Sequence, residues 1–223
     1  MTQRRAGAAR HAILRAIRDA LGDQPRPAYP AGNGIPSTNV QPGSRSDLRK
    51  MFSDELDRIG GSCRLVAEAA ELPAAVGRYV EEGEWASIVI QDRPAVHHAV
   101  SALGDRVIRA RAWSDMEHAN CAVVEAESLL ADSASAIVVL RDGAERLLPY
   151  LPPVCIVIAS AADLHAGMTN AALEPMFGPA RRGTTGEAVI LTGPSRTADI
   201  EKTLVLGAHG PHTLTVFLVE DPA

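Results

Sequence analysis

Aromatic residues and cysteines are both scarce in this chain. Phe, Trp and Tyr make up only 4% of the 223 residues although 46% are hydrophobic, so any core must be built mainly from Ala, Val, Leu and Ile. The three cysteines, Cys63, Cys121 and Cys155, are far apart and each lies in an apolar run. Iron–sulfur clusters and disulfide frameworks need grouped or paired cysteines. We therefore expect buried thiols and no cluster bound by this chain.

Long apolar runs and excess positive charge are also absent. No run approaches the length of about 18 apolar residues that a membrane span requires. The formal net charge of −5 argues against non-specific nucleic-acid binding. The basic start of the chain is not followed by an apolar segment, so a secretory signal is not expected and a cytoplasmic location is predicted.

Motifs for nucleotides and metals are missing as well. The sequence contains neither a Gly-x-Gly-x-x-Gly fingerprint after a predicted strand nor a P-loop. His209 and His212 are three residues apart and could share a metal ion, but a third ligand is not evident. We therefore expect no metal site.

The first 43 residues predict a helix and a linker. Ile13, Leu14, Ile17 and Leu21 recur at helical spacing, which indicates an amphipathic helix over residues 3–21. Residues 23–43 contain five prolines and three glycines, a composition typical of an extended linker. The helix could dock on its own domain, on a second copy or on a partner, and the sequence leaves these alternatives open.

Residues 44–223 predict one α/β domain. Strand-like runs at 63–67, 85–90 and 107–112 alternate with helical segments, a pattern typical of a parallel sheet covered on both faces. Runs at 121–127, 136–140 and 154–159 follow with little helix between them, which predicts a partly antiparallel segment. A helix is expected over residues 161–173. The predicted fold class is α/β, with a mixed, mostly parallel sheet, helices on both faces and an N-terminal helical extension.

A distinctive stretch lies between the apolar runs 188–191 and 213–219. It reads Gly-Pro-Ser-Arg-Thr-Ala-Asp-Ile-Glu over residues 193–201 and predicts a strand, a turn and a short helix. A helix N-terminus presents free backbone N–H groups, and Arg196 adds a planar fork of donors, so this junction favours an anion site. The alternative is a capped helix in which Arg196 pairs with Asp199 or Glu201.

Two carboxylates form the second candidate site. Glu125 and Glu127 are two residues apart in a strand-like run, which places both on one face of a regular strand. Neighbouring carboxylates can have separated pKa values and divide acid and base roles. The alternative is a strand end with two solvated carboxylates.

The stretch 193–201, with Leu-Val-Leu-Gly at 204–207 and His-Gly-Pro at 209–211, resembles the C-terminal signature of the lactate utilisation protein C family, also called the LUD domain. A looser similarity extends from about Arg45 to the end of the chain. The resemblance implies a fold like that of the sugar-phosphate isomerases and coenzyme A transferases. It also implies a role in oxidising L-lactate to pyruvate beside iron–sulfur partner proteins, which would carry the clusters.

The resemblance also implies site residues. Within the signature, the candidate ligand-binding residues are Gly193, Ser195, Arg196, Thr197 and His209. Residues 122–128 resemble the family's Ala-x-x-Glu-Thr-Gly-Thr, and a glutamate is the nucleophile in related transferase folds, so Glu125 is the candidate catalytic residue. This chain has Ala126 in place of the threonine and Glu127 in place of the glycine.

The residues and the resemblance together lead to three hypotheses about function. In the first, the chain is an accessory protein of L-lactate utilisation that binds a small carboxylate or organises the complex, with Arg196 holding the carboxylate and Glu125 across the cleft. In the second, it is a stand-alone transferase-like enzyme acting on a coenzyme A ester or a phosphorylated small molecule. In the third, it is a scaffold with an inactive pocket. The sequence does not decide whether the chain is catalytic.

Overall fold

The structure is a computed structural model that describes residues 2–21, 43–141, 143–177, 186–197, 205–206 and 210–221. The chain divides into two units, Met1–Gly34 and Ile35–Ala223. The sequence places the start of the folded domain at residue 44, and this boundary stays a prediction. No helix within the described ranges is both long and apolar enough to cross a membrane.

The first unit contains helix α1, Thr2–Leu21. Its isoleucines lie at helical spacing, and the structure leaves Ile13 61% and Ile17 49% exposed. The amphipathic helix predicted for this segment is therefore present, with two large apolar side chains on its surface.

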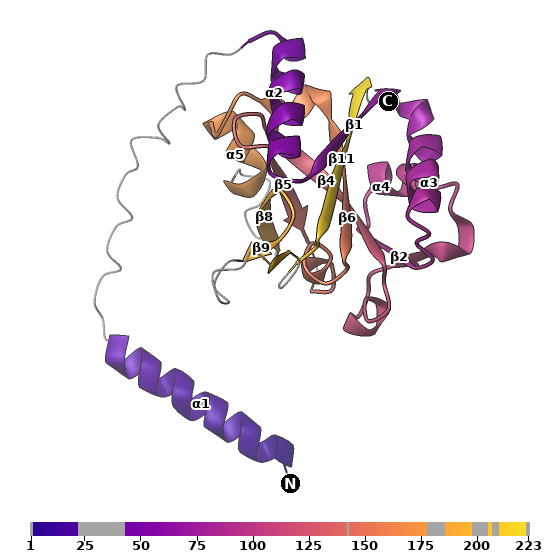
Figure 1. The fold of residues 1–223 in the computed structure, drawn as a ribbon. Helices are drawn as coiled ribbons and strands as arrows, with labels where there is room; N and C mark the ends of the chain where they lie inside the picture. The colour runs from indigo at the N-terminus through magenta and orange to yellow at the C-terminus, as the bar shows by residue number, and fades with distance from the viewer. Residues whose placement is uncertain are drawn as a thin grey trace. The chain divides into compact units, whose positions relative to one another are not determined.

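Parallel strands form the main part of the sheet in the second unit (Figure 1). Six strands lie in the order β1-β11-β6-β4-β2-β3, and each neighbouring pair is parallel. Their bounds are β1 Ser62–Glu68, β11 Thr213–Asp221, β6 Val154–Ser160, β4 Cys121–Leu130, β2 Ile88–Ile90 and β3 Val107–Arg109. All six strands therefore end at the same edge of the sheet, which we call the carboxyl edge; the opposite edge is the amino edge.

Strand β4 extends beyond its parallel neighbours and starts an antiparallel part of the sheet. Its second half pairs with β5, Ser135–Leu140, and β5 pairs in turn with β8, Glu187–Thr192. A β-bulge interrupts the β4–β5 register between Ala126 and Ser128. The short strand β7, Leu164–His165, runs parallel to β4. The predicted mixed, mostly parallel sheet is thus confirmed.

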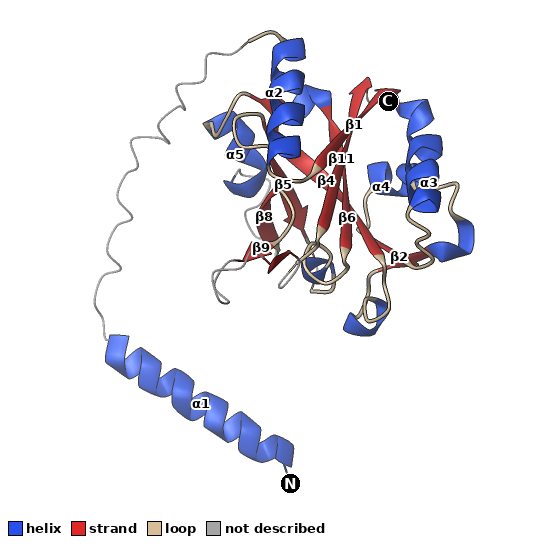
Figure 2. Cartoon of the chain, in the orientation of Figure 1, coloured by secondary structure: helices blue, strands red, loops and turns tan. Residues whose placement is uncertain are grey.

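Helices cover both faces of this sheet (Figure 2). The α-helices of this unit are α2 Arg45–Arg58, α3 Leu72–Glu82, α4 Pro94–Ala99 and α5 Asn170–Phe177, and the 3-10 turns are η1 Ala69–Glu71, η2 Gly104–Arg106, η3 Trp113–Asp115, η4 Glu145–Leu147 and η5 Ala161–Asp163. Helix α2 begins with a capping box, in which the Ser44 hydroxyl accepts from Asp47 N–H and the Asp47 carboxylate accepts from Ser44 N–H. Proline opens the first turn of both α3 and α4.

Two hydrophobic clusters hold these layers together. On one face, Phe52 and Leu56 of α2 pack in a cluster with the strand residues Val124 and Val157. On the other face, α3 and α4 join a cluster that includes the fully buried Phe217. Three aromatic residues meet there: the Tyr79 ring makes edge contacts with Trp85 and Phe217 at centroid distances of 5.0 and 5.7 Å.

The helix predicted over residues 161–173 is wrong in its first half. Residues Ala161–Asp163 form η5, and Leu164 and His165 pair with Leu129 and Leu130 of β4. The projecting part of β4 offers unpaired backbone groups, and this strand satisfies them. The α-helix starts only at Asn170.

Candidate active-site cavity

A cavity of about 550 Å³ opens at the carboxyl edge of the parallel strands. It lies where β6 and β11 end, beside the middle of β4, and where α3 and α4 begin. Ligands of α/β proteins bind at this edge, and the volume is within the usual range for ligand cavities. The lining residues are Ala69, Leu72, Pro94, Ala95, His98, Glu125, Ala126, Ile158, Ala159, Ser160, Ala162, Asp163 and Val219.

Two carboxyl groups give this largely apolar cavity its chemistry. Burial raises the pKa of Glu125; the nearby Arg93 opposes the shift and Glu127 adds to it. Burial also raises the pKa of Asp163, with His165 opposing and Glu127 adding. Among the described residues, no hydrogen bond engages the Glu125 side chain. Glu125 is therefore a half-buried carboxyl group, available to a ligand and more readily protonated than an ordinary glutamate.

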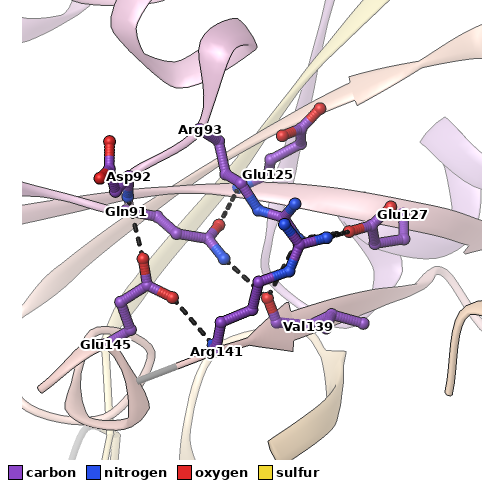
Figure 3. A network of polar contacts seen from close by, with 8 residues as sticks. All are labelled: Gln91, Asp92, Arg93, Glu125, Glu127, Val139, Arg141 and Glu145. Carbon is purple, nitrogen blue, oxygen red and sulfur yellow. Dashed lines mark hydrogen bonds and ion pairs between the residues drawn. The ribbon is translucent and has the colours of Figure 1, made fainter. Parts of the chain in front are cut away.

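Gln91 fixes the backbone beside Glu125 (Figure 3). Its side chain is fully buried, accepts from Glu125 N–H at 2.9 Å and donates to the Val139 carbonyl at 2.7 Å. Its own backbone N–H donates to the Val123 carbonyl at 3.0 Å. Strand β2 ends at Ile90. Just beyond it, the Gln91 side-chain amide bonds to the backbone of Glu125 in β4 and of Val139 in β5, as a backbone partner would, and so links β2, β4 and β5 where the sheet branches.

Two arginines meet the second glutamate of β4. Arg93, whose side chain is only 9% exposed, donates through Nη2 to Glu127 and, at 3.4 Å, to the Val139 carbonyl. Arg141 Nη2 lies 3.9 Å from Glu127 Oε1, and its side chain is 63% exposed. The Glu145 carboxylate accepts from the backbone N–H groups of Asp92 and Arg141, which ties together the segments that carry the two arginines (Figure 3).

The β-bulge explains why the two glutamates have different surroundings. Ala126 pairs with Val138 and Ser128 with Ile137, so Glu127 is the extra residue of β4. Glu125 lines the cavity, whereas Glu127 is directed at the two guanidinium groups (Figure 3). Bulges redirect side chains in this way. The predicted pair of neighbouring carboxylates is present, but only Glu127 has side-chain partners among the described residues, whereas Glu125 faces the cavity.

The signature residues lie at the amino edge instead. Gly193 has φ +75°, and a Cβ there would be 2.8 Å from Ile59 Cδ1, so both the conformation and the close packing favour glycine. Arg196 Nη2 donates to the Ile59 carbonyl at the C-terminal end of α2. Ser195 N–H donates to the Pro211 carbonyl at 2.8 Å, just before β11.

The expected helix does not begin at Arg196. Arg196 and Thr197 form strand β9, which pairs with β10, Val205–Leu206, in a separate two-stranded sheet. Arg196 and Thr197 are therefore extended, and their backbone pairs with β10; residues 198–204, where the rest of the expected helix would lie, are outside the described residues. Asp199, Glu201 and His209 lie outside the described residues.

The structure does not bring Arg196 and Glu125 together. Arg196 contacts Ile59, which precedes β1, whereas Glu125 lies near the opposite ends of the parallel strands. Sequence reasoning missed Gln91, Arg93 and Asp163. The signal for the first two was their position directly after the apolar run 88–90, at the end of a parallel strand.

Several known proteins are similar to this chain. The family model of the LUD domain matches residues 49–219. "Lactate utilization protein C" of Geobacillus thermodenitrificans is 27% identical over 243 residues, covering 95% of this chain and 96% of that protein. "Uncharacterized protein YkgG" of Escherichia coli is 27% identical over 170 residues, with 71% and 73% covered. A crystal structure of a DUF162 family protein from Deinococcus radiodurans shares the fold, with a TM-score of 0.58, 19% identity, and 80% and 99% covered.

Proposed function

The chain belongs to the LUD domain family, and on that premise we propose that it serves lactate utilisation as an accessory protein in the oxidation of L-lactate to pyruvate. The observation that carries the proposal is the similarity to a lactate utilization protein C along nearly the whole of both chains. A match of this extent includes the strands that form the cavity as well as the signature.

The partners proposed here are iron–sulfur proteins. Oxidation of lactate releases two electrons, and cysteine thiolates are the usual ligands of the clusters that would accept them. The three cysteines of this chain are free and far apart in the sequence, and Cys121 and Cys155 are buried in the sheet. Cluster ligands usually come in closely spaced groups of cysteines. This supports placing the redox centres in partner proteins, with this chain binding a small carboxylate or organising the complex.

The cavity offers a way to hold such a carboxylate. A protonated Glu125 can donate to an oxygen of lactate or pyruvate, and Asp163 can accept from the lactate hydroxyl. The proposed binding is therefore favoured by low pH, at which more Glu125 carries a proton. The anion site predicted from Gly193, Ser195, Arg196 and Thr197 stays a prediction.

Growth of a deletion strain on L-lactate as sole carbon source tests this function. We expect no growth without the gene, full rescue by the wild-type chain and by the surface control Glu117→Gln, and no rescue by Glu125→Ala. Glu125→Gln keeps a hydrogen-bond donor and should rescue in part. Normal growth of the deletion strain, in a background with no second lactate-oxidising system, would contradict the proposal.

The alternative is a stand-alone transferase acting on a coenzyme A ester or a phosphorylated small molecule. The size of the cavity favours it, because about 550 Å³ exceeds what a three-carbon acid needs. Its nucleophile would be the ionised Glu125, and a raised pKa reduces that form. Assays of the purified chain with acyl-coenzyme A donors distinguish the two functions. If the chain is a transferase, the wild type turns over the donor and the Glu125→Gln variant does not. If it is an accessory protein, neither the wild type nor any variant shows turnover.

A further inference from the structure

The two arginines beside the cavity have more N–H donors than their described neighbours have acceptors to offer. Arg93 is almost completely buried, yet its Nε has no hydrogen-bond partner in the described part of the chain. A guanidinium group presents its donors as a fork that fits two oxygens of one anion. Glu127 engages Arg93 through Nη2 alone. The fork is therefore only partly used, and a buried donor without an acceptor is unfavourable.

Arg141 adds a second guanidinium to the same place. Its Nη2 is 3.9 Å from the Glu127 oxygen that Arg93 contacts, so two cations share one carboxylate. The Arg141 side chain is largely exposed, while its backbone is held by Glu145 at 2.9 Å. This arginine can therefore reorient toward an incoming anion without disturbing the sheet.

Both arginines lie near the cavity, because the charges of Arg93 and Arg141 each act to lower the pKa of Glu125, which lines it. Arg93 directly precedes Pro94, and Glu127 directly follows Ala126; both Pro94 and Ala126 line the cavity. Glu127 is the unpaired residue of a β-bulge and its side chain is 30% exposed. Because neither a ladder partner nor close burial fixes Glu127, its carboxylate can leave the arginines for solvent.

We propose that Arg93 and Arg141 form an anion subsite at the edge of the cavity, which the Glu127 carboxylate occupies in the structure and which a ligand's carboxylate or phosphate group enters by exchange with Glu127. A ligand bound in this way has its anionic end on the two arginines and its remainder beside Glu125. The choice of a carboxylate-bearing ligand rests on the proposed function, whereas the exchange with Glu127 rests on the geometry alone.

Calorimetric titration of the full-length chain with sodium pyruvate, and separately with inorganic phosphate, tests the subsite. Glu127→Gln removes the competing charge and should tighten binding of the preferred anion at least about tenfold. Arg141→Gln should weaken it by about tenfold to a hundredfold, the usual range for a hydrogen bond to a charged group. The exposed Arg111→Gln is the matched control for overall charge and should leave the affinity unchanged.

Unchanged or weaker binding in a folded Glu127→Gln chain would overturn the proposal, because Glu127 would then only hold Arg93 in place. If Glu127→Gln does not fold, the exposed Arg141→Gln decides alone, and an unchanged affinity overturns the subsite. Binding of neither probe to any variant overturns it as well. Tighter binding of pyruvate would indicate a ligand with a carboxylate, and tighter binding of phosphate would indicate a phosphorylated ligand.

Growth on L-lactate separates this proposal from the proposed function. If the strain needs the chain for growth but the arginine and Glu127 variants bind pyruvate as the wild type does, the subsite fails and the function stands. If the deletion strain grows normally while the titrations behave as expected, the function fails and the anion subsite stands.

Discussion

The two edges of the parallel sheet use their polar residues differently. At the amino edge, the described contacts of the signature are structural: Gly193 packs on Ile59, Arg196 binds the end of α2, and Ser195 bonds to Pro211. At the carboxyl edge, the Glu125 carboxyl lines the cavity and the Arg93 Nε is buried nearby, and neither has a hydrogen-bond partner among the described residues. Within the described residues, the distinctive motif therefore makes contacts that hold the fold together, whereas residues near the strand ends leave polar groups unpaired beside the cavity.

Replacing the buried amide at the carboxyl edge should have the largest effect. Gln91→Leu leaves Glu125 N–H without its acceptor and removes the closer donor to the Val139 carbonyl, which then keeps only the 3.4 Å contact with Arg93. An unsatisfied buried group costs about 1–3 kcal/mol, so we expect the free energy of unfolding to fall by about 2 kcal/mol in urea denaturation. A loss well below 1 kcal/mol would show that the three strands do not depend on this amide.

The amino edge should respond more weakly. Arg196→Ala removes an exposed cation from the C-terminal end of α2, where positive charge is favourable, and should cost about 0.5–1 kcal/mol of stability. Pyruvate titration of the same variant sharpens the comparison. A tenfold to hundredfold loss of affinity would place the carboxylate at the amino edge, as the signature alone predicts.

The pH dependence of stability should give the smallest effect. The pKa of Glu125 is raised from its ordinary value of 4.5, so its contribution to stability is fully present below that value and is lost as the pH rises through the raised pKa. Glu125→Gln cannot ionise, and its stability relative to the wild type should rise across this window. Urea denaturation at a series of pH values measures the difference, and parallel curves would show that the carboxyl is not buried as described.

Much of the architecture could be predicted because buried apolar residues recur in the sequence at the spacing of helices and strands. The spacing of Ile13 and Ile17 predicts α1, and the alternation of apolar runs with capped helices predicts the parallel sheet. The change to an antiparallel segment after residue 121 was also visible in the sequence, because little helix separates the apolar runs.

The candidate site was harder to predict because tertiary context sets it. The bulge at Glu127 depends on how β5 pairs with β4, and nothing in the alternation of residues 121–130 marks it. Leu164 becomes part of a strand only because β4 projects beside it. Arg196 looked like the start of a helix because Ser and Thr are good caps, but pairing with Leu206 overrides that preference.

Hydrogen–deuterium exchange of the full-length chain, with and without saturating pyruvate, tests most directly which edge holds the ligand. The account predicts slower exchange in peptides covering residues 88–95 and 121–130, with no change over residues 187–197. Protection confined to residues 187–197 would contradict it and return the carboxylate to Arg196.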